Sequence, residues 1–286
     1  MSITNEKPSV TVIILTLNEE VNLQSCLDSV AWANEVIVLD SGSQDQTLEI
    51  ASRNGVKILS HSSDPFTFSA QRNYALDSGK INSEWVLFID ADEVVTDALR
   101  IELQNIFREP AKHTQEIIAY RIAPKYMFFG RWLKHCQGYP VWHDRLLRYG
   151  QARFKGGVWE SFETTGHIAH LNEPYLHYSL NKGIGEWFIK HERYATVEAI
   201  DILNTLNIQV YSPYRQRTSR KRIQRNIAAR LWPVRPIIRF VVMYFFRLGF
   251  LDGLPGLLYC LMMVSYEFMI LLKVIEFRRR NENLPI

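Results

Sequence analysis

Two common nucleotide-binding signatures are absent from this chain of 286 residues. No G-x-G-x-x-G follows the first strand-like run, and no G-x-x-x-x-G-K-[ST] occurs. The glycines of the first pattern let the backbone approach a dinucleotide, and those of the second form the loop of P-loop enzymes. Dinucleotide binding and P-loop chemistry are therefore both poorly supported.

The chain also has few cysteines, a small net charge and no apolar run at its N-terminus. The three cysteines, Cys26, Cys136 and Cys260, lack metal-site spacing and cannot all pair with one another. We therefore expect buried thiols in a reducing, cytoplasmic compartment. The first ten residues contain no targeting stretch, so no secretory signal is expected. A net charge of +3 is too small to indicate a nucleic-acid partner.

The first third of the chain alternates short β-branched runs with helical patterns. This alternation predicts a doubly wound α/β fold, in which helices flank a parallel sheet. The predicted strands are 10–15, 35–39, 56–60 and 85–89, and helices are expected to begin near Val21, Asp45, Ser69 and Thr96. The segment from about 116 to about 202 has weaker periodicity and is predicted to form loops and short strands around a site.

Polar residues follow three of the predicted strands. They are Thr16, Asn18 and Glu19 after the first, Asp40 to Ser43 after the second, and Asp90 to Glu93 after the fourth. Ligands of such sheets bind outside the carboxyl ends of the strands. The three clusters are therefore predicted to meet at one ligand-binding edge.

The stretch FIDADE places Asp90 and Asp92 on either side of the small Ala91. Carboxylates can hold a hard divalent cation, which takes up the charge that develops on a leaving diphosphate. The same two aspartates could instead cap the next helix or face solvent. Asp40 precedes a turn and could accept hydrogen bonds from a base or a ribose.

Four motifs resemble one enzyme family in their order and spacing. TVIILTLNEE, EVIVLDSGSQDQT, FSAQRNYAL and WVLFIDADE are similar to the inverting family 2 glycosyltransferases of the GT-A fold. Two later stretches, GRWLKHCQGYPVWHDRLLRYGQARFKGGVWESF and LHYSLNKGIGEWFIKHERYATVEA, resemble the subgroup that glucosylates the inner core of bacterial lipopolysaccharide.

The resemblance implies which residues contact a UDP-sugar donor. They are Thr16, Asn18, Glu19, Asp40, Ser41, Arg72, Asp90 and Ala91. Asp40 would contact the uridine, and Arg72 would approach the diphosphate or support its loop. Many relatives carry a second aspartate where this chain has Ser41, which weakens the prediction of base recognition. Asp90 and Asp92 would bind Mn or Mg, with Asp92 as the more direct ligand.

An inverting transfer needs a carboxylate that takes the proton from the acceptor hydroxyl. The resemblance favours Glu160, which follows a glycine-containing loop, and Asp144 is the second choice. Asp144 could equally pair with Arg145 or Arg148. The resemblance also suggests His177 as a late metal ligand, although a buried hydrogen-bonding histidine is an equal alternative.

Acceptor and phosphate contacts are assigned to Arg145, Arg148 and Trp159. Either arginine could bind a phosphate, and surface ion pairing is as well supported. Trp142 and Trp159 are among the aromatic residues that could stack on sugar rings, and Trp159 is preferred because it adjoins Glu160.

A basic segment near 211–230 precedes two apolar stretches at the C-terminal end. We predict a catalytic domain over 1–210, with a donor half over about 1–115 and an acceptor half over about 116–210, and a basic, membrane-associating region over 211–286. Glu267 and Asp252 would be costly in hydrocarbon, so helices lying in or dipping into the cytoplasmic leaflet of the inner membrane are favoured over a spanning hairpin. A helical pair packed on the catalytic domain is the alternative.

These patterns together predict a metal-dependent hexosyltransferase. Its donor would be UDP-glucose and its acceptor a hydroxyl of a lipid-anchored glycan, with the lipopolysaccharide inner core implied by the resemblance. Alternatives are a polyprenyl-phosphate-linked or other cell-surface glycan acceptor, a nucleotidyltransferase, and a non-catalytic binding protein on the membrane. The oligomeric state is left open.

Overall fold

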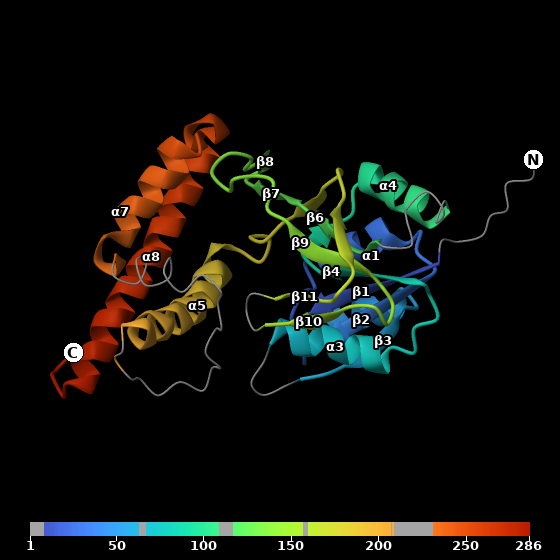
Figure 1. The fold of residues 1–286 in the computed structure, drawn as a ribbon, viewed down its shortest axis with the longest axis horizontal. Coiled ribbons are helices and arrows are strands. Elements are labelled where there is room, and N and C mark those ends of the chain that lie inside the picture. The colour runs from blue at the N-terminus through green and yellow to red at the C-terminus, as the bar shows by residue number, and fades with distance from the viewer. Residues whose placement is uncertain (1–8, 63–66, 109–116, 157–159, 207, 209–230) are drawn as a thin grey trace, which may run out of the picture. The chain divides into compact units, whose positions relative to one another are not determined.

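The computed structural model describes residues 9–62, 67–108, 117–156, 160–206, 208 and 231–286 (Figure 1). The chain forms two compact units. The first contains Met1–Tyr126 and Tyr139–Asn181, and the second contains Met127–Gly138 and Lys182–Ile286. The predicted boundary near residue 210 falls outside the described residues.

The first unit is built on a seven-stranded mixed sheet with the order β12-β6-β9-β4-β1-β2-β3. Within it, β9 runs antiparallel to both of its neighbours, β4 and β6, while the other neighbouring strands are parallel. The strands are β1 (Val10–Thr16), β2 (Glu35–Asp40), β3 (Lys57–Ser60), β4 (Trp85–Asp90), β6 (Ile117–Ile122), β9 (His143–Arg148) and β12 (His167–His170). The predicted α/β class is confirmed, and each predicted strand matches to within one residue.

Apolar side chains cover both faces of this sheet. The helices are α1 (Leu23–Val30), α2 (Thr47–Arg53), α3 (Phe68–Ser78) and α4 (Asp97–Arg108). Leucines and isoleucines of α1, α2 and α4 pack with one face, and Ala75 and Leu76 of α3 pack with the other. The pairing of the central strands is set by their β-branched runs, which are buried on both faces as parallel strands require.

The middle of the chain supplies short strands, as predicted, and one long helix that was not. The strands are β5 (Glu93–Val94), β7 (Pro124–Phe128), β8 (Arg131–Trp132), β10 (Arg153–Lys155), β11 (Ser161–Glu163) and β13 (Tyr175–His177). Helix α5 (Ile184–Thr205) replaces the loops predicted up to 202. Its buried positions Ala195, Ala199 and Leu203 recur every fourth residue, but two of the three are small alanines, which weakens that signal.

The second unit contains the short strand β8 and the end of β7, and it is otherwise mainly helical where the structure describes it. Besides α5 it contains η1 (Trp232–Val234), α7 (Arg235–Phe240), a π-helical segment η2 (Val241–Phe246), η3 (Gly249–Asp252) and α8 (Gly253–Asn281). Ile270 and Val274 of α8 pack against Ala195 and Ala199 of α5. By length and composition, one described helix, Gly249–Asn281, could cross a membrane.

The two acidic residues of the apolar stretches are buried and paired within the protein. Asp252 is 2% exposed and accepts the backbone N–H groups of His135 and Cys136. Glu267 is 5% exposed and lies 2.8 Å from the guanidinium of Arg235. Neither carboxylate therefore has to face an apolar surrounding without a partner.

Candidate active site

The carboxyl ends of β1 and β2 are joined by a hydrogen-bonded turn around Asp40. The Asp40 carboxylate is 1% exposed and accepts the backbone N–H groups of Gly42 and Ser43, each at 2.9 Å. The hydroxyl of Thr16 also donates to it at 3.0 Å, and the N–H of Ser41 donates to the carbonyl of Thr16. Asp40 thus holds the turn in shape, and its predicted contact with uridine remains a prediction.

A second connection fixes the loop that follows β1. Asn18 has a positive φ of 54°, and its side-chain oxygen accepts the N–H of Gln44 at 2.8 Å. The N–H of Glu19 donates to the hydroxyl of Thr47 at 2.7 Å. The predicted donor residues of the first two clusters therefore do converge in space, as the parallel pairing of their strands requires.

Asp90 ends β4 between two buried arginines. Arg72 donates to its Oδ1 at 2.8 Å and Arg145 to its Oδ2 at 3.0 Å. Burial by itself would raise the pKa of Asp90, but these two guanidinium groups outweigh it and hold that pKa well below its ordinary value. Both oxygens of Asp90 are thus engaged by arginines.

Asp92 lies beside His177, although 85 residues separate them in the chain. The two come together because β13 pairs with β5, which places His177 opposite Glu93. His177 Nε2 is 3.2 Å from Asp92 Oδ2, and the carboxylate raises the pKa of His177 against the opposing effect of burial. Buried His177 Nδ1 has no hydrogen-bond partner among the described residues.

This pair fits a divalent cation in part. An oxygen and a nitrogen donor suit Mn²⁺ or Mg²⁺, with Mn²⁺ the better match for a histidine. Among the described residues, no group of three or more histidine, cysteine, aspartate or glutamate side chains is arranged to hold a metal. A bound ion would thus need diphosphate oxygens or water to complete its coordination.

Glu93 is a site residue that the sequence reasoning did not single out. Its carboxylate is fully buried, accepts the N–H of Asp90 at 3.0 Å and lies 2.5 Å from the guanidinium of Arg145. Burial raises the pKa of Glu93 to about 7 in spite of Arg145. The only sequence signal was its place in the FIDADE motif. Arg145, predicted to contact a phosphate of the donor or acceptor or to form a surface ion pair, is 4% exposed and pairs with Asp90 and Glu93, so surface ion pairing is corrected and the phosphate contact stays a prediction.

Replacing Arg145 with methionine should destabilise the protein strongly. The change leaves Glu93 and Asp90 without their shared partner, and removing one member of a buried ion pair costs about 3–5 kcal/mol. Urea unfolding would measure this loss. Arg153→Met is the control, because Arg153 pairs with Asp77 in an exposed bridge worth at most about 1 kcal/mol. Equal effects of the two changes would contradict the role given to Arg145.

Glu160 and Asp144, the two candidates for the base, have different surroundings. Glu160 forms an ion pair with Arg72, and its Oε2 has no hydrogen-bond partner among the described residues. Asp144 has one oxygen 2.5 Å from Arg121 Nε, and the other accepts the N–H of Phe162 at 2.6 Å. Both oxygens of Asp144 thus bind other parts of the protein, whereas Glu160 Oε2 has no partner in the part of the chain that the structure describes.

Of the two remaining predicted contacts, Arg148 lies away from this site and Trp159 cannot be placed. Arg148 is in register with Trp85 at the start of β4 and pairs with Glu84 at 2.7 Å. Five residues of strand separate Trp85 from Asp90, or roughly 17 Å at about 3.4 Å per residue. The structure therefore corrects the placement of Arg148, which lies at the opposite edge. Trp159 falls outside the described residues.

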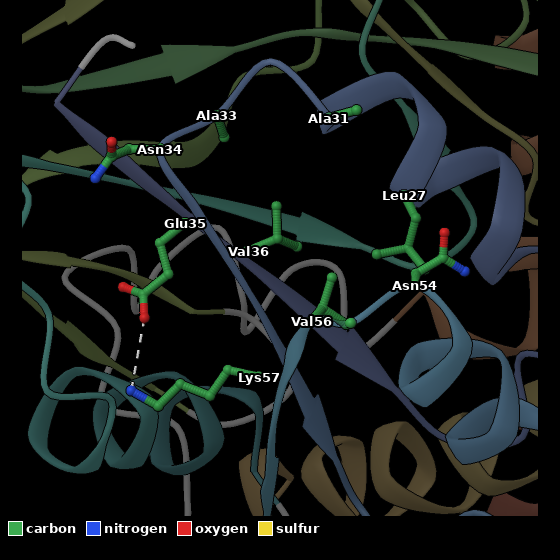
Figure 2. Close-up of a pocket in the computed structure, with 10 residues that line it drawn as sticks. Leu27, Ala31, Ala33, Asn34, Glu35, Val36, Asn54, Val56 and Lys57 are labelled. Atoms are coloured by element: carbon green, nitrogen blue, oxygen red, sulfur yellow. Dashed lines mark ion pairs between the residues drawn. The ribbon is translucent and has the colours of Figure 1, made fainter. Parts of the chain in front are cut away.

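A hollow on the opposite edge is unrelated to these carboxylates. Figure 2 shows it at the start of β2 and β3, with Glu35 and Lys57 3.6 Å apart. Small apolar residues such as Ala33 and Val36 form much of its wall. It contains none of the predicted site residues.

A comparison of the sequence with known families identifies the family of this chain. The profile described as glycosyl transferase family 2 matches residues 11–162, just over half of the chain. This range includes β1 to β4, Asp90, Asp92, Asp144 and Glu160. The chain belongs to glycosyl transferase family 2, and its sheet is a mixed α/β sheet.

The curated relatives add little to the family assignment, because each is either distant in sequence or aligned over only part of its length. A lipopolysaccharide core biosynthesis glycosyltransferase of Rhizobium meliloti, LpsC, is 25% identical over 68% of this chain and 71% of its own length. An uncharacterised glycosyltransferase of Rickettsia typhi is 36% identical over 42% of this chain. The aligned region spans only 40% of that relative.

Two solved structures share parts of the fold. Glucosyl-3-phosphoglycerate synthase of Mycobacterium tuberculosis, solved with Mn²⁺, UDP and phosphoglyceric acid, is 16% identical with a TM-score of 0.44, over 72% of this chain and 80% of that one. TarS of S. aureus is 17% identical with a TM-score of 0.43, over 96% of this chain and 90% of that one.

Proposed function

We propose that this protein transfers a hexose, with inversion, from a UDP-sugar to a hydroxyl of a lipid-anchored glycan. The observation that carries the proposal is the convergence of Asp90, Asp92, His177 and Glu160 around the carboxyl end of β4 in a family 2 chain. UDP-glucose is the proposed donor and the lipopolysaccharide inner core the proposed acceptor. The relative named for lipopolysaccharide core biosynthesis supports that acceptor.

In the proposed reaction, Glu160 accepts the proton of the acceptor hydroxyl as that oxygen attacks the anomeric carbon. The bond from this carbon to the diphosphate oxygen breaks on the opposite side, so the configuration inverts. Arg72 holds Glu160 near Asp90. Asp92 and His177 would hold Mn²⁺ or Mg²⁺, which compensates the charge of the departing diphosphate. The paired arginines keep Asp90 ionised beside the donor.

Nucleotide release from UDP-sugars, with and without Mn²⁺ or Mg²⁺, tests this function. We expect metal-dependent UDP release that increases when lipopolysaccharide core oligosaccharide is added, and a product heavier by one hexose in mass spectrometry. Release of pyrophosphate from a sugar phosphate and UTP would indicate a nucleotidyltransferase instead. Absence of turnover with every UDP-sugar would overturn the proposal.

The second unit supports attachment to the cytoplasmic face of the inner membrane. Large apolar side chains are exposed on it, including Ile237 at 69%, Phe246 at 78% and Leu254 at 67%. Large apolar side chains exposed on α7, η2 and α8 favour a protein or membrane contact. Basic residues Arg278, Arg279 and Arg280 end α8, where anionic lipid would attract them. Because Asp252 and Glu267 are paired within the protein, the free-energy cost of placing their charges near hydrocarbon is reduced.

Charged residues in this surface should release the protein from membranes. We expect Phe246→Glu combined with Leu254→Glu to lower the fraction that sediments with vesicles of phosphatidylethanolamine and phosphatidylglycerol by about tenfold, since each exposed apolar side chain contributes about 1.5–3 kcal/mol when buried. Ile101→Glu, on the exposed face of α4, is the matched control. Equal sedimentation of all three proteins would contradict membrane attachment through this surface.

A further inference from the structure

An exposed aromatic pair lies at the start of β9. The rings of Trp142 and His170 are stacked, with centroids 4.3 Å apart and planes at 29°. Trp142 is still 37% exposed, although the imidazole covers part of it. Its indole is therefore held in place by one neighbour and presents the rest of its apolar area to solvent.

This pair lies at the same edge of the sheet as the carboxylates. Because β9 runs antiparallel to β4, its first residues lie toward the carboxyl end of β4, where Asp90 is found. His170 is the last residue of β12, which runs parallel to β6. Ile122, which ends β6, is in register with His143, next to Trp142. Both rings thus lie on the acceptor side of the catalytic edge.

A short chain of contacts joins the pair to the proposed base. His170 is in register with Arg121, whose guanidinium pairs with Asp144 at 2.5 Å. Asp144 accepts the N–H of Phe162, two residues after Glu160. The aromatic pair is thus linked to the segment that carries Glu160 through Arg121 and Asp144.

A second chain of contacts leads to the proposed metal ligands. His143, which follows Trp142, has its Nε2 3.3 Å from the hydroxyl of Tyr126. The ring of Tyr126 is 5.0 Å from the ring of His177. His143, the sequence neighbour of Trp142, is therefore linked through Tyr126 to the proposed metal ligand His177.

We propose that the exposed indole of Trp142, backed by His170, binds a pyranose ring of the acceptor glycan. One face of a pyranose carries C–H groups and is apolar, so it packs on an aromatic ring while the hydroxyls at its rim stay hydrated. A rigid, pre-stacked indole binds such a ring without first losing side-chain entropy. The inference rests on the proposed transferase function and assigns this surface to the sugar that neighbours the attacking hydroxyl.

Kinetics with two substrates can test this assignment. The probe is the oligosaccharide released from lipopolysaccharide by mild acid, with UDP-glucose and Mn²⁺. In Trp142→Ala we expect the KM for the oligosaccharide to rise about tenfold, which corresponds to about 1.4 kcal/mol of binding free energy. The kcat and the slow hydrolysis of UDP-glucose without acceptor should stay within about twofold. Trp142→Phe should restore most of the affinity, because a flat ring remains.

Tyr149→Ala is the matched control. Tyr149 is 40% exposed at the other end of β9, where its hydroxyl donates to the carbonyl of Leu76. Loss of an exposed aromatic residue there should leave the KM for the oligosaccharide unchanged. Quenching of tryptophan fluorescence by the oligosaccharide, measured in wild type and Trp142→Phe, reports binding without turnover.

The outcomes separate the two proposals. An unchanged oligosaccharide KM in Trp142→Ala, with normal UDP-glucose hydrolysis, would overturn the sugar platform and leave the transferase function intact. An equal rise in KM in Tyr149→Ala would also overturn it, because the effect would then be general. Wild-type protein that releases no UDP would refute the function, and loss of the fluorescence response in Trp142→Phe would then still decide whether Trp142 binds sugar.

Discussion

Asp92→Ala should lower kcat/KM on the order of 10²- to 10³-fold and remove the response to added Mn²⁺. Asp92 is the carboxylate of the FIDADE motif that lies beside His177, whereas both oxygens of Asp90 are engaged by arginines. Loss of one group that stabilises leaving-group charge has effects of this size. Steady-state kinetics over a series of Mn²⁺ concentrations would measure the change.

Metal binding can be followed apart from turnover. The electron paramagnetic resonance signal of free Mn²⁺, titrated with protein and UDP, should show weaker binding by Asp92→Ala than by wild type. Asp97→Ala is the control, since Asp97 is exposed in the first turn of α4 and pairs only with Arg100 in the described contacts. Full turnover with unchanged Mn²⁺ affinity in Asp92→Ala would refute the metal assignment.

Glu160→Gln should lower kcat about 10²- to 10⁴-fold, the range that general-base catalysis contributes. Glutamine keeps the shape of the side chain but cannot accept the proton of the acceptor hydroxyl. Binding of UDP should be retained, which isothermal titration calorimetry can confirm. Rapid-quench measurement of a single turnover would show whether the chemical step itself has slowed.

Two other variants decide between the possible bases. Glu163→Gln is the matched control, because Glu163 ends β11, the strand that directly follows Glu160, and forms an exposed pair with Lys155. Asp144→Asn should mainly lower stability, since both oxygens of Asp144 hold Arg121 and the N–H of Phe162. Unaltered turnover in Glu160→Gln together with a large loss in Asp144→Asn would move the catalytic role to Asp144.

The order of strands explains why some site residues were predictable. Parallel strands have their carboxyl ends at one edge, so Thr16, Asp40 and Asp90 could be placed together from the apolar runs before them. His177 was suggested by resemblance alone. Its position beside Asp92 depends on the pairing of β13 with β5, which no local periodicity encodes. Glu93 was overlooked because a third carboxylate after a strand reads as a solvated residue until its burial is known.

The same distinction holds for the charged residues outside the motif. Arg145 and Arg148 are three residues apart on one strand and looked equivalent in sequence. The antiparallel pairing of β9 with β4 places Arg145 beside Asp90 and Arg148 near Trp85 at the opposite edge. In the sequence, Asp252 and Glu267 counted against burial of this segment in the hydrocarbon of a membrane. The structure shows that both carboxylates have partners within the second unit.

The sequence by itself determined the α/β class, the central strands and the residues that end them, because these depend on the spacing of apolar side chains along a few neighbouring residues. The tertiary structure decided which carboxylate is clamped by arginines, which has a histidine beside it, and which aromatic ring stays exposed. Those outcomes depend on contacts between strands that are 50 to 85 residues apart in the chain, as with Asp90 and Arg145 or Asp92 and His177. Their free energies come from burial and charge pairing, which only the packed fold sets.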